Sequence, residues 1–281
     1  MSTPVVQPAR PPASEPPQSP APEAGRPVYT RIAVLGLVLI AAAPGLMLTL
    51  GLLGGMAVGE DLPFFATLIG VPLVSAALVW RFGLWAKALG ILAALGVGAM
   101  MFWAAFGLAY PGSLADFVPG VLLPLGLVLA IGGSIAAIVQ GRRGRREASA
   151  TPAERRLVGF ALGLVAMAAV VSVVVGFTQR ESFSEADADM TATIADFEFV
   201  EGTYEVSAGQ PTTILVRNDD PFTHTFTVPD LGIDHTLVAG AEALVEVDAE
   251  AGTYTLYCEP HSNMNEPDPE HAGMAGTLIV Q

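Results

Sequence analysis

Cysteine, histidine and methionine, the soft and borderline ligands of metal ions, gather near the C-terminal end of the sequence. Cys258 is the only cysteine of the chain, and His261 and His271 are two of its four histidines. Met264 and Met274 lie in the same stretch. Thiolate and thioether sulfur favour Cu(I), and imidazole suits copper in both oxidation states. The stretch therefore predicts a metal site, with copper as the preferred ion.

Two predicted strands point Cys258 and a further histidine, His224, inward. Period-2 alternation places Cys258 on the apolar face of residues 252–258. In residues 221–228 it predicts an inward face made of Phe222, His224, Phe226 and Val228. The opposite face is made of Thr223, Thr225 and Thr227. Taken singly, an inward histidine is usually a hydrogen-bonded core residue and a buried cysteine a small hydrophobe. Combined with His261 and a nearby methionine, they form the ligand set of a blue-copper electron-transfer site.

The segments that carry these residues resemble the cupredoxins, the group of plastocyanin, pseudoazurin and halocyanin. They are residues 218–226 (NDDPFTHTF), 252–261 (GTYTLYCEPH) and 273–280 (GMAGTLIV). The resemblance covers residues 190–281, and it implies an all-β Greek-key sandwich with one type 1 copper ion. The family's ligands fall on His224, Cys258, His261 and a methionine.

The methionine ligand is the position at which the sequence departs from the family pattern. Met274 precedes the final strand, as the family's methionine does, but it lies 13 residues after His261. Met264 has a shorter spacing from His261 but runs into an acidic, proline-containing stretch. An insertion in the ligand loop accounts for the long spacing and favours Met274, with Met264 as the alternative. His271 in place of His261 is a weaker alternative, and His235 and His271 otherwise fit exposed loop histidines.

The ligand set favours an electron carrier over an enzyme. A binuclear copper centre needs two bridging thiolates, so a single cysteine excludes it. The main hypothesis is a membrane-tethered blue-copper protein that transfers electrons at the outer face of the cytoplasmic membrane. The alternative is copper binding for storage, delivery or sensing, with Met264 and His271 as transfer ligands. A cupredoxin-shaped scaffold without redox chemistry fits less well, because the ligand set is complete.

Charge divides the chain into two parts. Residues 1–181 carry 12 Lys/Arg against 8 Asp/Glu, whereas residues 182–281 carry Arg217 alone against 19 Asp/Glu. Such asymmetry indicates two domains in two environments. The acidic part would attract basic redox partners, such as cationic cytochromes or a membrane oxidase or reductase; adaptation to acid or salt is an equally good explanation. Nothing in the sequence indicates nucleic-acid binding.

The acidic part reads as seven or eight short strands separated by turns, which predicts an antiparallel sandwich. The strand-like runs are residues 191–200, 203–209, 212–218, 224–228, 235–238, 243–247, 252–258 and 276–280.

The basic part predicts a membrane bundle. Five apolar stretches are each long enough to cross a bilayer, at residues 32–58, 63–80, 84–109, 117–139 and 157–177. Basic residues occur before the first stretch and in alternate loops, which places the N-terminus in the cytoplasm and the C-terminal domain outside. The stretches hold no histidine or cysteine, so they predict an anchor without metal or proton chemistry.

The resulting division of the chain has six segments. Residues 1–30 are rich in proline and predict a disordered cytoplasmic tail. Four transmembrane helices at 31–140 are followed by a basic cytoplasmic loop at 141–156 and a fifth helix at 157–177. A linker at 178–190 leads to the copper domain at 191–281.

Overall fold

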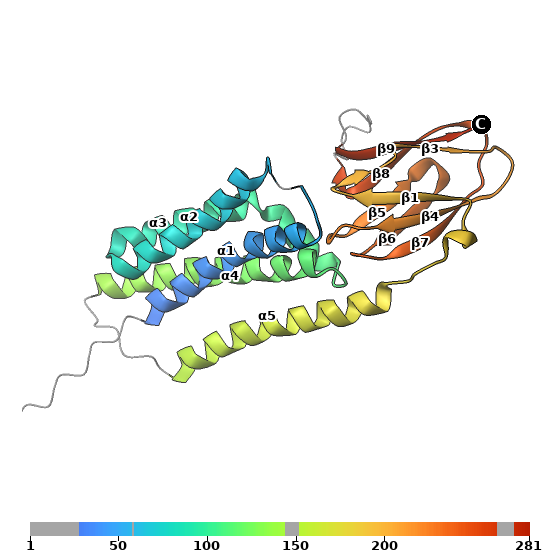
Figure 1. Ribbon diagram of the computed structural model, residues 1–281. Helices are drawn as coiled ribbons and strands as arrows, with labels where there is room; N and C mark the ends of the chain where they lie inside the picture. The colour runs from blue at the N-terminus through green and yellow to red at the C-terminus, as the bar shows by residue number, and fades with distance from the viewer. Residues whose placement is uncertain (1–27, 58, 144–151, 263–272) are drawn as a thin grey trace, which may run out of the picture.

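The chain folds into a helical part followed by a β-sandwich, as Figure 1 shows. The computed structural model describes residues 28–57, 59–143, 152–262 and 273–281. Residues 1–27 of the predicted disordered tail and 144–151 of the predicted basic loop therefore lie outside the described residues, as do Met264 and His271, whereas residues 28–30 of the predicted tail are helical.

Five α-helices and a 3₁₀ helix form the N-terminal part. They are α1 (Val28–Leu53), α2 (Leu62–Arg81), α3 (Leu84–Met100), η1 (Phe102–Ala109), α4 (Leu114–Arg142) and α5 (Pro152–Gln179). The start of α4 is fixed by Ser113, whose hydroxyl accepts a hydrogen bond of 3.3 Å from the backbone N–H of Asp116. Such an N-cap satisfies one of the amide groups that the first helical turn leaves free.

Four of the described helices are long and apolar enough to cross a membrane, and a fifth candidate span is bent. The predicted third span, 84–109, is not one straight helix, because α3 ends at Met100 and η1 continues at an angle of 57°. Beyond the bend, in η1, Gly107 lies against the backbone of Asp116, so closely that a Cβ atom at position 107 would overlap the Asp116 carbonyl. This contact between η1 and α4 favours the bent course of the chain.

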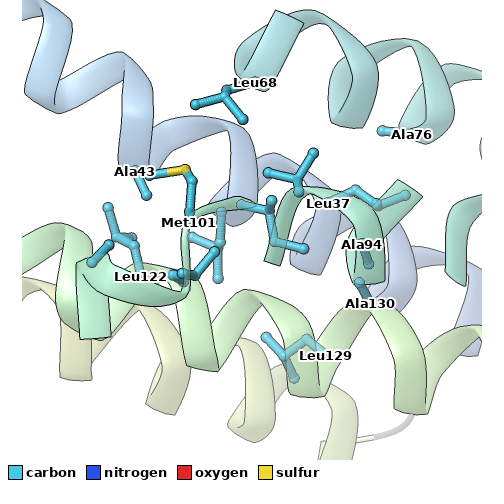
Figure 2. Packing of buried hydrophobic residues seen from close by; sticks show 14 of the residues in the cluster. Leu37, Ala43, Leu68, Ala76, Ala94, Met101, Leu122, Leu129 and Ala130 are labelled. Atoms are coloured by element: carbon cyan, nitrogen blue, oxygen red, sulfur yellow. The ribbon is translucent and has the colours of Figure 1, made fainter. Parts of the chain in front are cut away.

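The helical core lies between α1, α2, α3 and α4, and Figure 2 shows part of its packing. Leu37 from α1, Leu68 from α2 and Leu129 from α4 are among its buried side chains. Helices α1 and α4 approach closely where Gly36 faces the backbone of Gly126 and Ala130. Small residues at such a crossing allow backbone-to-backbone packing, which drives helix association in a bilayer.

Within the described residues, nine strands form the two sheets of the C-terminal sandwich. The four-stranded sheet has the order β2-β1-β4-β7, and the five-stranded sheet has the order β3-β9-β8-β5-β6. The strands are β1 (Met190–Ala195), β2 (Glu198–Phe199), β3 (Thr203–Val206), β4 (Thr212–Asn218), β5 (His224–Val228), β6 (Ile233–Leu237), β7 (Glu242–Val247), β8 (Gly252–Ser262) and β9 (Gly273–Val280). Most neighbours are antiparallel, but β1 pairs with β4 and β3 with β9 in parallel. The predicted helical bundle followed by a β-sandwich is confirmed.

The sandwich has one strand more than expected, because residues 191–200 split into two. Asp196 and Phe197 both adopt a positive φ, at 53° and 60°, and turn the chain from β1 into β2. The left-handed conformation costs about 1–2 kcal/mol per non-glycine residue. The surrounding structure must therefore hold this turn, and the contacts that hold it belong to the metal centre described below.

The face of β5 that the sequence places opposite His224 is not exposed to solvent. Thr223, Thr225 and Thr227 are all buried. Thr227 donates to Asp234 of β6, and Thr225 accepts from the backbone N–H of Glu259 in β8, so neighbouring chain covers this face. The inward prediction is confirmed for His224, Phe226 and Val228, which are 0% exposed.

Phe222 is buried, but it packs with the helical core rather than inside the sandwich. It precedes β5, so the alternation of the strand does not apply to it. Around it, Thr223 donates its backbone N–H to Asp116 of α4 at 2.7 Å, and Ser113 lies 3.4 Å from the carbonyl of Pro221. The segment that leads into β5 is thus held by the start of α4.

Candidate metal centre

His224, Cys258 and His261 come together at one end of the sandwich. His224 is the first residue of β5, while Cys258 and His261 belong to β8. The Cys258 sulfur lies 3.6 Å from Nδ1 of His224 and 3.4 Å from Nδ1 of His261. The two Nδ1 atoms are 3.1 Å apart. The structure therefore brings the three predicted ligands together, each presenting one donor atom to a common centre.

The size of this triangle suits one metal ion. Two imidazole nitrogens at about 2.0 Å and a sulfur at about 2.3 Å in a trigonal plane would lie about 3.5–3.8 Å apart. The separations of 3.1–3.6 Å lie close to these values and are shorter by up to about 0.4 Å. A thiolate with two imidazoles is the equatorial set of a type 1 copper site.

The protonation of two ligands is shifted by burial. Burial raises the pKa of the Cys258 thiol to about 11, against hydrogen bonds from backbone N–H groups that favour the thiolate. Burial also lowers the pKa of His261 to about 3, and the neighbouring His224 ring adds to this effect. At neutral pH His261 is therefore an uncharged ligand, and metal binding at Cys258 must displace a proton.

The backbone next to the site also contacts the sulfur. The N–H of Thr225 lies 3.3 Å from the Cys258 sulfur, and it reaches across from β5 to β8. A donor aimed at a thiolate withdraws charge from it and raises the reduction potential of a bound metal. The side chain of Thr225 accepts from the N–H of Glu259 at 2.8 Å, which fixes the two strands at the ligand end.

Asp220, four residues before His224, is a buried carboxylate that supports the site. Its Oδ2 lies 2.9 Å from Nε2 of His224. A carboxylate on the outer nitrogen leaves Nδ1 free for a metal and orients the ring. The pKa of Asp220 is lowered: burial acts to raise it, but hydrogen bonds from His224 and from the N–H groups of Phe197 and Asp196 outweigh that effect.

The same carboxylate holds the strained turn between β1 and β2. Asp220 accepts from the backbone N–H of Asp196 at 2.8 Å and of Phe197 at 2.9 Å. The ring of Phe197 then packs edge-on against both histidines, with centroid distances of 5.3 Å to His224 and 4.7 Å to His261. One buried carboxylate therefore positions both a ligand and the aromatic ring that covers the ligands.

Met274 is the second residue of β9, the strand that pairs with the ligand-bearing strand β8. It is 3% exposed and belongs to the same buried cluster as Cys258. The regular pairing of β8 with β9 shifts beyond Tyr257 and resumes where Ser262 pairs with Gly273. Ser262 directly follows His261, and Gly273 directly precedes Met274. The ends of the long ligand loop thus meet at the site. The choice of Met274 as the axial ligand stays a prediction, since Met264 and His271 lie outside the described residues.

Two supporting residues were missed by the sequence analysis. Asp220 lies between the predicted strands 212–218 and 224–228, and a carboxylate four residues before a ligand histidine is a usable signal. Phe197 carried no signal, since its position depends on the turn after β1. His235, expected in a loop, is exposed on strand β6.

Comparison with solved structures finds copper proteins that match about a third of the chain. Among solved structures, the chain is similar to a copper-containing nitrite reductase from Thermus scotoductus (20% identity, TM-score 0.26, covering 33% of this chain and 22% of that one). It is also similar to a purple cupredoxin from Nitrosopumilus maritimus (21% identity, TM-score 0.25, covering 33% of this chain and 100% of that one).

Sequence comparison gives a curated relative and a family match. A chloroplastic plastocyanin from Fritillaria agrestis is 30% identical over 95 residues, which cover 29% of this chain and 51% of the plastocyanin. The chain thus spans about half the length of this curated relative. Residues 165–269 match the family model described as a cupredoxin-like domain. The match begins within α5 and includes the strands that carry His224, Cys258 and His261. The C-terminal β-sandwich of this chain is a cupredoxin-like domain.

Proposed function

We propose that the protein is a membrane-anchored blue-copper electron carrier. The observation that supports this most strongly is the buried triangle of His224, Cys258 and His261, whose donor atoms all lie within 4.8 Å of one another. Two imidazoles and one thiolate can hold copper in both oxidation states with little rearrangement. When bound, copper would supply the one-electron couple.

The chain's own residues divide the remaining tasks. His224, Cys258 and His261 would hold the ion, and Met274 would supply a weakly bound thioether sulfur. Asp220 orients His224, and the N–H of Thr225 stabilises the negative charge on the Cys258 sulfur. These contacts come from β5, β8 and the turn before β5, so two paired strands fix the geometry.

The apolar helices serve as the anchor, with the N-terminus in the cytoplasm and the copper domain at the outer face of the cytoplasmic membrane. The support for this orientation is the distribution of basic residues, most of which lie before or at the start of α1, at the end of α2 and the start of α3, and from the end of α4 to the start of α5. The partners are redox proteins, and the 19 acidic residues of the outer domain favour basic ones. The protein passes electrons and is not itself a catalyst.

Voltammetry of the copper-loaded full chain in detergent tests the carrier against the storage alternative. A carrier shows a reversible one-electron couple, and it keeps its copper in both states in the presence of a competing chelator. A chain that holds Cu(I) but releases Cu(II) to the chelator would contradict the proposal and favour storage or delivery. Cys258→Ser, which removes the only thiolate, is the control that must abolish the couple.

A further inference from the structure

A cavity of about 1040 Å³ lies between the helical part and the ligand end of the sandwich. Residues of α1, α2, η1 and α4 line one side, and Phe197, Phe222 and His261 line the other. Its volume lies at the upper end of the range of small-molecule sites in proteins. One metal ligand, His261, thus forms part of the wall of a space large enough for an organic molecule.

The helical side of the cavity is aromatic and reaches the molecular surface. Phe64, Trp103 and Phe106 line it and are 40%, 40% and 66% exposed. These side chains belong to helices that are candidate membrane spans, so their exposed faces would contact lipid. A ligand would therefore enter from the hydrocarbon side, and flat aromatic walls favour a ring.

The charged groups of the lining are predominantly carboxylates, which accept hydrogen bonds. Five carboxylates line the cavity, those of Asp61, Asp116, Asp196, Glu198 and Glu259, together with the hydroxyl of Tyr110. The described lining residues include no lysine or arginine. Such a lining repels phosphate and accepts hydrogen bonds from hydroxyl groups. A permanently charged ammonium head would fit the carboxylates but is costly to bring through hydrocarbon.

We propose that the cavity binds a lipid-soluble hydroquinone, with its ring and hydroxyl groups toward His261 and its apolar tail toward the bilayer. An uncharged aromatic head with hydroxyl donors suits both the aromatic walls and the carboxylate acceptors. The choice of a redox-active head rests on the proposed function, because the cavity adjoins a ligand of the copper site. The bend between α3 and η1 has a role in this arrangement, since it turns Trp103 and Phe106 into the cavity wall.

Calorimetric titration of the metal-free full chain in detergent, without oxygen, tests the proposal with probes of equal tail length. We expect decylhydroquinone to bind saturably, at one per chain. Decylbenzoquinone, decyl phosphate and decyltrimethylammonium should each bind at least tenfold more weakly, because they lack hydroxyl donors or carry a charge. Equal binding of all four, as simple partition into detergent would give, overturns the proposal. Stronger binding of the ammonium or phosphate probe overturns it as well.

Two variants locate the site. Phe106→Ala removes a wall of the cavity and should weaken decylhydroquinone binding about tenfold. Phe160→Ala on α5 removes an equally exposed ring (69% exposed) that is not part of the lining, and it should leave binding unchanged. Equal effects of the two variants would contradict the assignment.

Copper loading of the same preparation is measured separately by its absorption. A copper-binding chain without hydroquinone binding would refute this inference alone, whereas hydroquinone binding without a copper–thiolate band would refute only the proposed function.

Discussion

Replacing Asp220 by asparagine tests how far one buried carboxylate organises the metal centre. The side chain keeps its shape but loses its charge. At present Oδ1 accepts from the N–H of Asp196, while Oδ2 accepts from the N–H of Phe197 and contacts His224. An amide offers one oxygen only. The better orientation keeps that oxygen at the position of Oδ2, and the amide NH₂ then faces the N–H of Asp196.

The expected loss follows from these contacts. One buried N–H without a partner costs about 1–3 kcal/mol, and the remaining bonds lose the extra strength that an ionised acceptor gives them. Relaxation of the strained turn offsets part of this cost. The free energy of unfolding of the sandwich should therefore fall by about 2–4 kcal/mol, which corresponds to a 30- to 1,000-fold larger equilibrium constant for opening.

Hydrogen exchange of the full metal-free chain, followed by mass spectrometry on peptides from β8 and β9, measures this change. Asp219→Asn is the matched control, because it makes the same charge change at an exposed neighbouring position. The reduction potential of the copper-loaded Asp220→Asn protein should also rise, since a negative charge next to His224 is lost. Exchange and potential both equal to those of Asp219→Asn would refute the supporting role of Asp220.

Three further results are expected. Because the pKa of His261 is lowered to about 3 in the folded chain, the unfolded chain alone binds a proton as the pH falls below about 6.5. The metal-free protein should lose up to about 1.4 kcal/mol of stability per unit from pH 6 to 5, measured by hydrogen exchange, and His261→Gln should remove that slope. Met274→Leu should raise the copper reduction potential by removing a donor to Cu(II), while Met264→Leu leaves it unchanged; the reverse result in voltammetry would make Met264 the axial ligand. Gly36→Ala should lower the melting temperature of the helical part, because the added Cβ would meet the backbone of Ala130. Gly45→Ala, in the same helix, adds a Cβ where there is open space and should raise the melting temperature. Equal shifts of the two variants would argue against close packing of α1 on α4.

The ligand triangle could be predicted from sequence because its chemistry is local. Strand alternation turns Cys258 and His224 toward the same interior, and His261 follows Cys258 by three residues, where the regular pairing of β8 with β9 is interrupted. These rules hold wherever a strand has one apolar face. The order of His224, Cys258 and His261 with their flanking strands therefore indicated both the sandwich and the metal.

The surroundings of the triangle could not be predicted, because they depend on contacts between distant segments. Phe197 reaches the histidines only because Asp220 holds two residues at positive φ, and β-rich residues 191–200 carry no sign of that turn. Phe222 fits the strand pattern, but its side chain packs in the helical core. The bend after Met100 likewise results from packing of Gly107 on α4, which hydropathy does not record.

Visible absorption and electron paramagnetic resonance of the Cu(II)-loaded full chain, compared with Cys258→Ser, test the central claim most directly. If His224, Cys258 and His261 bind copper as a type 1 site, the wild-type chain shows an intense thiolate-to-copper band with one copper per chain, and Cys258→Ser abolishes the band. A Cu(II)-loaded chain that is colourless, or whose band survives in Cys258→Ser, would contradict the assignment.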